Sequence, residues 1–264
     1  MRRARAEPVV KVRAMRIRGW ILPAAAGLAA LVAAASSAQP SAPRAIPREA
    51  PAEPVVVELF TAQGCAGCPE VNARVEALAA EPGVIALTYA VDYWDYLGWE
   101  DTFARPEFAE RQRKYRRPLR LRAVSTPQVV VDGRRTAPVT AAEALQAVVD
   151  EEAARRVFPP EIEFRESGDR VGVGSGRVPT GGAEVVAVIY KPGPQTVEIG
   201  AGDNRGRTVR HVNVVRAVRV LGDWAGRPAL YRLPAGVHED EAVAVLVQAR
   251  ADRRILNGAV RTPG

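Results

Sequence analysis

The chain has 264 residues, of which 47% are hydrophobic and 25% charged, as in a globular protein that buries an apolar core. Its formal net charge of +7 is concentrated at the start, because residues 1–38 hold seven of the 37 basic residues and one of the 30 acidic residues. The charges of the remaining residues nearly balance, which argues against a nucleic-acid-binding protein.

Residues 1–38 have the pattern of an export signal. A basic segment ending at Arg18 precedes an alanine-rich apolar run at 21–35, and the small residues at 36–38 suit cleavage by a signal peptidase. A transmembrane helix needs roughly twenty apolar residues, so this shorter run favours a cleaved signal over an uncleaved anchor. Residues 39–54 contain five prolines and are expected to form an extended linker. We therefore expect a periplasmic or secreted protein with no stable membrane span after cleavage.

Residues 55–158 alternate between strand and helix patterns. Continuous apolar runs are typical of strands buried on both faces, and apolar residues three or four positions apart are typical of helices. The expected elements are strands at 55–60 and 84–91 enclosing a helix from Pro69, a helix at 101–115, strands at 128–131 and 134–137 joined by a turn at Asp132 and Gly133, and a helix opened by a capping box at Thr140. The order βαβ, helix, ββα predicts an α/β domain with a parallel crossover.

From residue 159 onward, short β-like runs alternate with clusters of glycine and proline. The runs lie at 161–165, 170–173, 184–190, 196–200, 208–221, 229–233 and 242–249. This series predicts a small antiparallel β-sandwich of about seven strands over residues 159–264. We expect no catalytic residues in it, and a role in partner recognition or self-association.

Both cysteines of the chain, Cys65 and Cys68, lie between the first predicted strand and the first predicted helix. Unpaired backbone N–H groups and the helix dipole stabilise a thiolate at the N-terminus of a helix and so raise its reactivity. We expect Cys65, on the solvent side, to be the attacking thiol and Cys68, inside the helix, to resolve the mixed disulfide. Pro69 is tolerated there because the first helical N–H groups have no intrahelical acceptor.

Two other interpretations of the cysteine pair remain open. A purely structural disulfide that closes so short a loop contributes only ~2 kcal/mol in the chain-entropy estimate. A copper(I) carrier would hold the ion between the two sulfurs and a third ligand, for which His211 and His238 are the only imidazoles in the sequence. Both methionines lie within residues 1–38, so the rest of the chain offers copper(I) no thioether ligand. A structural zinc site would need four nitrogen or sulfur ligands, and the sequence has two cysteines and two distant histidines.

The motif Cys-x-x-Cys-Pro on a strand-to-helix turn, with Thr126-Pro127 opening the third strand, resembles the thioredoxin-like superfamily. Longer blocks at 57–65, 91–99, 125–128 and 202–207 are similar to DUF1223, a family of exported bacterial proteins of unknown function. The resemblance implies a thioredoxin-like fold for residues 55–158 and a cis Pro127 packed against the cysteine pair. DUF1223 proteins usually carry two serines between the cysteines, where this chain has Ala66 and Gly67, so a redox potential cannot be transferred.

Further side chains are expected near the cysteines. Parallel strands at 55–60 and 84–91 would place the next loop at the same sheet edge as Cys65. Tyr93, Trp94 and Asp95 of that loop, together with Thr126, are therefore candidates for binding a substrate, although the aromatic residues would equally well pin the loop to the protein. Glu58 lies near where thioredoxins carry a buried acid that moves protons for the inner cysteine. The alternative for Glu58 is a solvent-facing position at a strand edge.

The sequence thus predicts an exported thiol–disulfide oxidoreductase, with Cys65, Cys68, Pro127 and Glu58 as its catalytic residues. The expected partner is a protein or small molecule that carries a thiol or disulfide, with no nucleic acid, no organic cofactor and no metal required. The alternative is a non-catalytic binding module or a copper(I) delivery protein built on the same scaffold.

Overall fold

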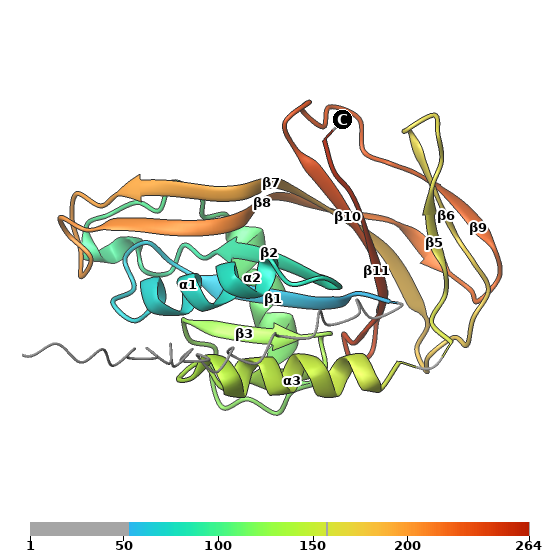
Figure 1. Cartoon of the computed structure of the whole chain (residues 1–264), viewed down its shortest axis with the longest axis horizontal. Helices are drawn as coiled ribbons and strands as arrows, with labels where there is room; N and C mark the ends of the chain where they lie inside the picture. The colour runs from blue at the N-terminus through green and yellow to red at the C-terminus, as the bar shows by residue number, and fades with distance from the viewer. Residues whose placement is uncertain (1–52, 157, 264) are drawn as a thin grey trace, which may run out of the picture. The chain divides into compact units, whose positions relative to one another are not determined.

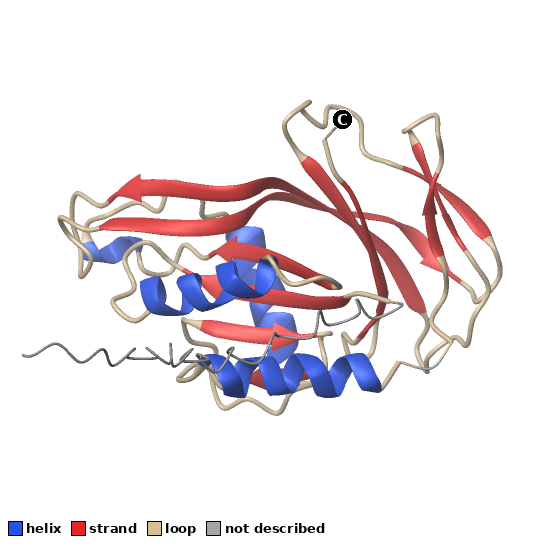
Figure 2. Ribbon diagram, viewed as in Figure 1, coloured by secondary structure: helices blue, strands red, loops and turns tan. Residues whose placement is uncertain are grey.

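A computed structural model describes residues 53–156 and 158–263, so the predicted export signal and nearly all of the predicted linker lie outside the described residues. Within the described residues, three α-helices and one short 3₁₀ helix accompany eleven strands (Figure 2). In chain order they are β1 (Val55–Thr61), α1 (Cys68–Ala79), β2 (Val84–Ala90), η1 (Asp95–Leu97), α2 (Pro106–Arg116), β3 (Gln128–Val131), β4 (Arg135–Ala137), α3 (Ala142–Ala154), β5 (Ile162–Phe164), β6 (Arg170–Val173), β7 (Ala183–Glu198), β8 (Thr208–Trp224), β9 (Ala229–Arg232), β10 (Ala242–Ala249) and β11 (Ile255–Arg261).

Eight strands form one mixed sheet in the order β11-β10-β7-β8-β2-β1-β3-β4 (Figure 1). β1 and β2 are parallel along their whole length, and β3 pairs with β1 in the antiparallel sense. The long hairpin of β7 and β8 joins this group through a parallel pairing of Val214 with Thr88 on β2. A second, antiparallel sheet contains β5, β6 and β9.

The expected fold, a thioredoxin-like α/β domain followed by a small antiparallel β-sandwich, is wrong. The elements of residues 55–154 follow one another as the sequence pattern indicates, but their four strands supply only half of a sheet completed by β7, β8, β10 and β11. The protein is mostly β. The error has a physical cause: an apolar run shows that a strand is buried, whereas the identity of its neighbour depends on contacts between residues far apart in the sequence.

Two helices begin differently from the sequence expectation. The helix expected at 101–115 begins only at Pro106, because a residue before proline is kept out of the helical region and Arg105 is extended, with φ −142° and ψ 141°. The capping box expected at Thr140 is wrong, since α3 has Ala141 at its N-cap and no side-chain capping hydrogen bond. No helix within the described ranges is long and apolar enough to cross a membrane.

Two strands also differ from the sequence pattern. The prolines near residue 192 were expected to end a strand, but β7 continues through them by means of an irregularity between Lys191 and Pro194. The Gly193 N–H in this irregularity donates to Asn213 Oδ1 of β8 at 2.9 Å. β11 was not predicted, and it contains Asn257-Gly258, a pair that is more often found in turns.

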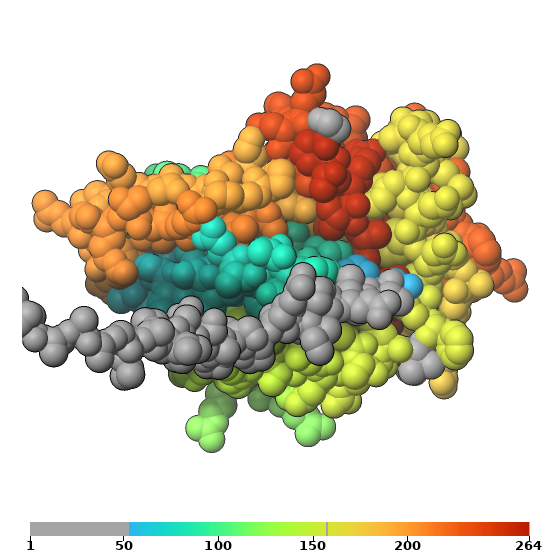
Figure 3. All heavy atoms as spheres, in the orientation of Figure 1, coloured from blue at the N-terminus to red at the C-terminus, as the bar shows by residue number. Residues whose placement is uncertain are grey.

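The core lies on both faces of β1. Val55, Val57 and Leu59 face α1 and α3, whereas Val56 and Phe60 face α2 and the half of the sheet made by β7, β10 and β11. β8 also packs along α1, and its residues lie beside those of α1 on the face seen in Figure 3. The cysteine segment, which connects β1 to α1, therefore sits where the two halves of the sheet meet.

Candidate functional site

The two cysteines form a disulfide at the beginning of α1. Their Cα atoms are 5.4 Å apart, and Cys68 is the first residue of the helix, one position before the predicted start at Pro69. Cys65, expected on the solvent side, is only 3% exposed, and Cys68 is completely buried. The two residues between them, Ala66 and Gly67, are exposed, so the open approach to the disulfide lies over this pair.

Trp94, Thr126 and Pro127 meet at the cysteine segment. The Thr126-Pro127 peptide bond is cis, as the resemblance implied, and a Cβ placed on Gly67 would lie 3.7 Å from Pro127 Cδ. Trp94 packs against Gly64, where an added Cβ would lie 3.5 Å from Trp94 Cβ, and its indole Nε1–H donates to Thr126 Oγ1 at 2.6 Å. These predicted neighbours of the cysteines therefore share one surface.

Tyr93 and Asp95, the other two candidates for binding a substrate, make hydrogen bonds that hold their own loop in place. The Tyr93 hydroxyl donates to Gln112 Oε1 of α2 at 3.1 Å, and Asp95 Oδ1 accepts the N–H of Asp101 at 3.2 Å. Beyond them, Tyr96 is 77% exposed and stacks on Trp94 with a centroid distance of 6.3 Å. The aromatic surface beside the disulfide is thus made by the half-buried Trp94 and the exposed Tyr96.

A residue of the β7–β8 loop, Asn204, holds the cysteine segment in place. Its side-chain Nδ2 donates to the backbone carbonyls of Gln63 and Cys65, each at 2.8 Å, and its Oδ1 accepts from Arg207 Nη1 at 2.9 Å. Asn204 is completely buried. No catalytic residue was expected within residues 159–264, and the only sequence signal for Asn204 was its place in the family-like block at 202–207.

Gln63 and Asp101 form a second support that sequence reasoning missed. The Gln63 N–H donates to Asp101 Oδ2 at 2.7 Å, and the Gln63 side chain accepts from Trp99 Nε1 at 2.8 Å. Asp101 is almost fully buried, and burial raises its pKa to about 6, although the N–H groups of Gln63 and Phe103 act in the opposite direction. A carboxyl group with a raised pKa therefore holds the backbone two residues before Cys65.

Glu58 is buried, but its carboxylate is held by α2. Arg111 Nε donates to Glu58 Oε1 at 2.7 Å, and the Tyr115 hydroxyl donates to Oε2. Gln248 of β10 joins this group by donating to the Tyr115 hydroxyl at 2.9 Å. The structure thus gives Glu58 a place in a polar network that links β1, α2 and β10.

The described residues contain no group of three or more His, Cys, Asp or Glu side chains placed to hold a metal ion. His211 is buried against Phe103 with a ring-centroid distance of 5.5 Å, and burial lowers its pKa to about 4. His238 is exposed in the loop before β10.

The chain is similar to one protein family and to two solved structures. The family model described as a protein of unknown function, DUF1223, matches residues 56–248. Protein AGR_C_4864 from Agrobacterium tumefaciens has a solved structure that is 31% identical, with a TM-score of 0.68, over 82% of this chain and 96% of that chain. HBP35 of Porphyromonas gingivalis shares the fold at 16% identity and a TM-score of 0.52, over 80% of this chain and 75% of that chain. A search of curated proteins gave no match. The chain belongs to the DUF1223 family.

Proposed function

We propose that this protein carries out thiol–disulfide exchange through Cys65 and Cys68. The observation that carries the proposal is the disulfide at the first turn of α1, reached over the exposed Ala66 and Gly67. At this position the helix dipole favours the thiolate that exchange requires, both as attacking group and as leaving group. A disulfide with a purely structural role gains little from closing a loop this short.

In the oxidised protein, a client thiolate attacks Cys65 Sγ, the bond to Cys68 breaks, and its electron pair leaves on Cys68 as a thiolate at the start of α1. A second client thiolate then attacks the client sulfur in the mixed disulfide, and Cys65 leaves as a thiolate. The client is oxidised to a disulfide and the protein is reduced to a dithiol. The same steps in reverse reduce a client disulfide.

The proposed partner is a protein or small molecule that carries a thiol or disulfide. Trp94 and Tyr96 offer it an aromatic surface, and Thr126 and Pro127 border the disulfide. We place this activity in the periplasm or outside the cell. The export pattern of residues 1–38 supports that location, because disulfides persist in such compartments.

The test is the rate at which the reduced protein reduces insulin, measured for the wild type and for Cys65→Ser and Cys68→Ser, with thiol counting after equilibration in glutathione buffers. We expect Cys65→Ser to abolish exchange and Cys68→Ser to accumulate a mixed disulfide with glutathione, because its resolving thiol is missing. Asp203→Ala, an exposed substitution in the β7–β8 loop, serves as the matched control. A wild-type rate equal to that of Cys65→Ser, or tight copper(I) binding without exchange, would overturn the proposal.

A further inference from the structure

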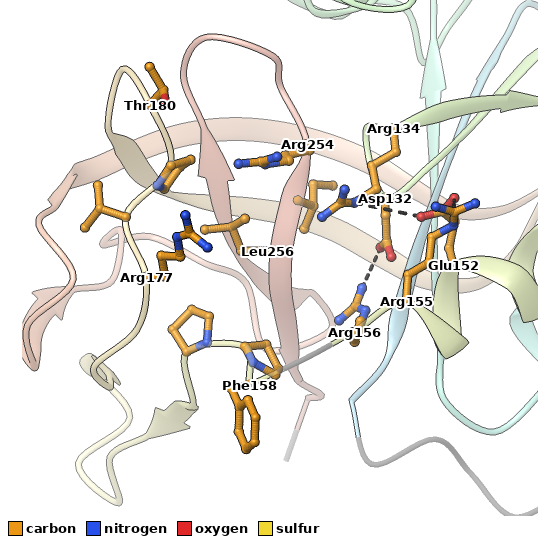
Figure 4. Close-up of a pocket in the computed structure, with 15 residues that line it drawn as sticks. Asp132, Arg134, Glu152, Arg155, Arg156, Phe158, Arg177, Thr180, Arg254 and Leu256 are labelled. Atoms are coloured by element: carbon orange, nitrogen blue, oxygen red, sulfur yellow. Dashed lines mark hydrogen bonds and ion pairs between the residues drawn. The ribbon is translucent and has the colours of Figure 1, made fainter.

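A cavity of about 420 Å³ lies between the C-terminal end of α3, the β3–β4 turn, the loop before β7 and the start of β11 (Figure 4). None of the residues assigned to the cysteine site lines it. Its most notable side chains are arginines from four separate segments of the chain: Arg134, Arg155, Arg156, Arg177 and Arg254. A volume of this size suits a small molecule.

The positive charge of the cavity exceeds its negative charge. Five guanidinium groups face two carboxylates, those of Asp132 and Glu152, which leaves an excess of three positive charges. Because both carboxylates are almost fully buried, the protein cannot bring them closer to the more distant arginines without rearranging its core. The cavity therefore has a net positive field that a concave surface focuses.

The arginines differ in the hydrogen bonds and ion pairs that they make with the protein. Arg156 is anchored, with Nη2 donating to Asp132 Oδ1 at 2.6 Å and Nη1 to Asn257 Oδ1 at 3.1 Å. Glu152 lies 3.4 Å from Arg155 Nε and 3.8 Å from Arg134 Nε, which gives these two arginines ion pairs. Neither Nε makes a hydrogen bond to any of the residues that the structure describes.

The arginines from the other two segments have even fewer partners within the cavity. Arg254 Nε lies 3.5 Å from Asp252, a residue outside the cavity lining, and has no hydrogen-bond partner among the described residues. Arg177 is exposed, and within residues 53–156 and 158–263 it has neither a hydrogen bond nor an ion pair. In Figure 4 these two arginines lie apart from the group around Asp132 and Glu152.

We infer that this cavity binds a small polyanion that carries at least two phosphate or carboxylate groups. The guanidinium fork matches such oxyanions in a bidentate geometry, and donors without partners gain the most from an incoming acceptor. One anionic group of the ligand lies against Arg177 and Arg254, and another lies against Arg134 and Arg155. Arg156, which is held by Asp132 and Asn257, lines the cavity between these two positions.

The experiment measures binding of pyrophosphate and of citrate by isothermal titration calorimetry at low ionic strength, with acetate at matched ionic strength as the monovalent comparison. We expect one or both polyanions to bind, and Arg177→Gln and Arg254→Gln each to weaken that binding about tenfold. The two probes distinguish a phosphate ligand from a carboxylate ligand. The polyanion whose affinity falls more in Arg177→Gln and Arg254→Gln identifies the class of the ligand.

The matched control is Arg232→Gln, which removes one exposed arginine from β9, outside the cavity. We expect it to leave binding of the polyanions unchanged, since a general effect of net charge would act equally at every exposed arginine. Equal loss in Arg232→Gln and Arg177→Gln, binding of acetate as tight as that of both polyanions, or no binding of either polyanion would overturn the proposal.

Discussion

At the scale of single residues, Asn204 connects the C-terminal half of the chain to the cysteines. Its side-chain N–H groups donate to the carbonyls of Gln63 and Cys65, and its side-chain oxygen accepts from Arg207. A primary amide is the only uncharged side-chain group that both donates twice and accepts in this way. The shape of the Cys-x-x-Cys loop therefore depends on a residue well over a hundred positions away.

Replacing Asn204 with alanine should destabilise the protein and slow thiol–disulfide exchange. The substitution leaves the buried Gln63 carbonyl without its donor, whereas the Cys65 carbonyl keeps only the N–H of Cys68, at 3.1 Å. We therefore expect a loss of about 1–3 kcal/mol in the free energy of unfolding. Urea denaturation followed by tryptophan fluorescence gives this value, and insulin reduction gives the rate. Asp203→Ala, at the exposed neighbouring position, should change neither quantity. Equal stability of the two variants would show that the Asn204 hydrogen bonds do not hold the loop.

His211 should make the protein less stable in acid. Neither ring nitrogen has a hydrogen-bond partner within the described part of the chain, and burial lowers its pKa to about 4, from 6.5. The unfolded chain therefore takes up a proton near pH 6.5, whereas the folded protein does so only near pH 4. The stability linked to this group is complete above pH 6.5 and falls as the pH drops towards 4, by about 3 kcal/mol in total.

The variant His211→Leu removes this dependence, so its loss of stability between pH 7.5 and pH 4.5 should be smaller than that of the wild type by ~2–3 kcal/mol. Urea denaturation at the two pH values measures the difference. Asp101 acts in the opposite direction, since its raised pKa favours the folded state at lower pH, but it is present in both proteins and cancels. His238→Gln, at an exposed position, should behave like the wild type. An unchanged pH dependence in His211→Leu would contradict the argument.

At the scale of elements, the sequence predicted which segments form strands and helices better than it predicted their neighbours. β1, β2 and β3 lie close to the expected bounds, because short apolar runs signal burial directly. β8 beside β2 was not predictable, since one parallel pairing brings together residues that no local pattern connects. The same limit applies to the site: Trp94, Thr126 and Pro127 were expected near the cysteines, whereas Asn204 and Asp101 depend on long-range topology.

β11, which is absent from the predicted strands, depends on a glycine at a close contact. Asn257-Gly258 has the composition of a turn, yet the glycine lies within a strand that crosses β1 closely. A Cβ placed on Gly258 would lie 2.9 Å from Val56 Cγ2, so only glycine permits this approach.

The β3–β4 turn at Asp132 and Gly133 was predicted, but its contacts reach much further than a turn requires. The Asp132 carbonyl accepts the N–H of Ile255 at 2.7 Å, and its Oδ1 accepts the N–H of Val56 at 2.8 Å. A Cβ added to Gly133 would lie 2.1 Å from the Arg253 carbonyl oxygen. The turn therefore fixes the position of β1 against the chain that enters β11.

Gly133→Ala should cost at least about 3 kcal/mol in the free energy of unfolding, because the new methyl group meets backbone that cannot move independently. Gly182→Ala is the matched control. Both glycines have a positive φ, of 62° and 81°, but no atom lies within 4 Å of a Cβ added at Gly182. That control should lose only the ~1–2 kcal/mol of the left-handed conformation. Equal losses in the two variants, measured by thermal or urea unfolding, would show that the contact with Arg253 is unimportant.

At the scale of the whole molecule, the two halves of the chain share one core. Val56, Phe60 and Leu87 from the first half pack in the same cluster as Val186 and Leu246 from the second. The polar network inside this cluster also joins both halves, because Glu58 and Arg111 connect through the Tyr115 hydroxyl to Gln248. Separation of the halves would leave Glu58 paired with Arg111 but would remove Gln248, which accepts from Arg111 Nη1 at 3.3 Å and donates to the Tyr115 hydroxyl. The buried groups would lose these hydrogen bonds, so the network opposes separation.

The division predicted at residues 158 and 159 can be tested by cutting the chain there. A fragment of residues 53–158 would expose the face of β1 that β10 and β11 cover, the edge of β2 that β8 pairs with, and the Glu58–Arg111 ion pair, which would lose its contacts with Gln248. We therefore expect it to lack a cooperative thermal transition and near-ultraviolet circular dichroism, whereas residues 53–264 show both. Mixing it with residues 159–264 should restore the transition, since each fragment supplies the surface that the other lacks. If the fragment of residues 53–158 unfolds cooperatively alone, the shared core is not required for folding and the predicted division marks two independent domains.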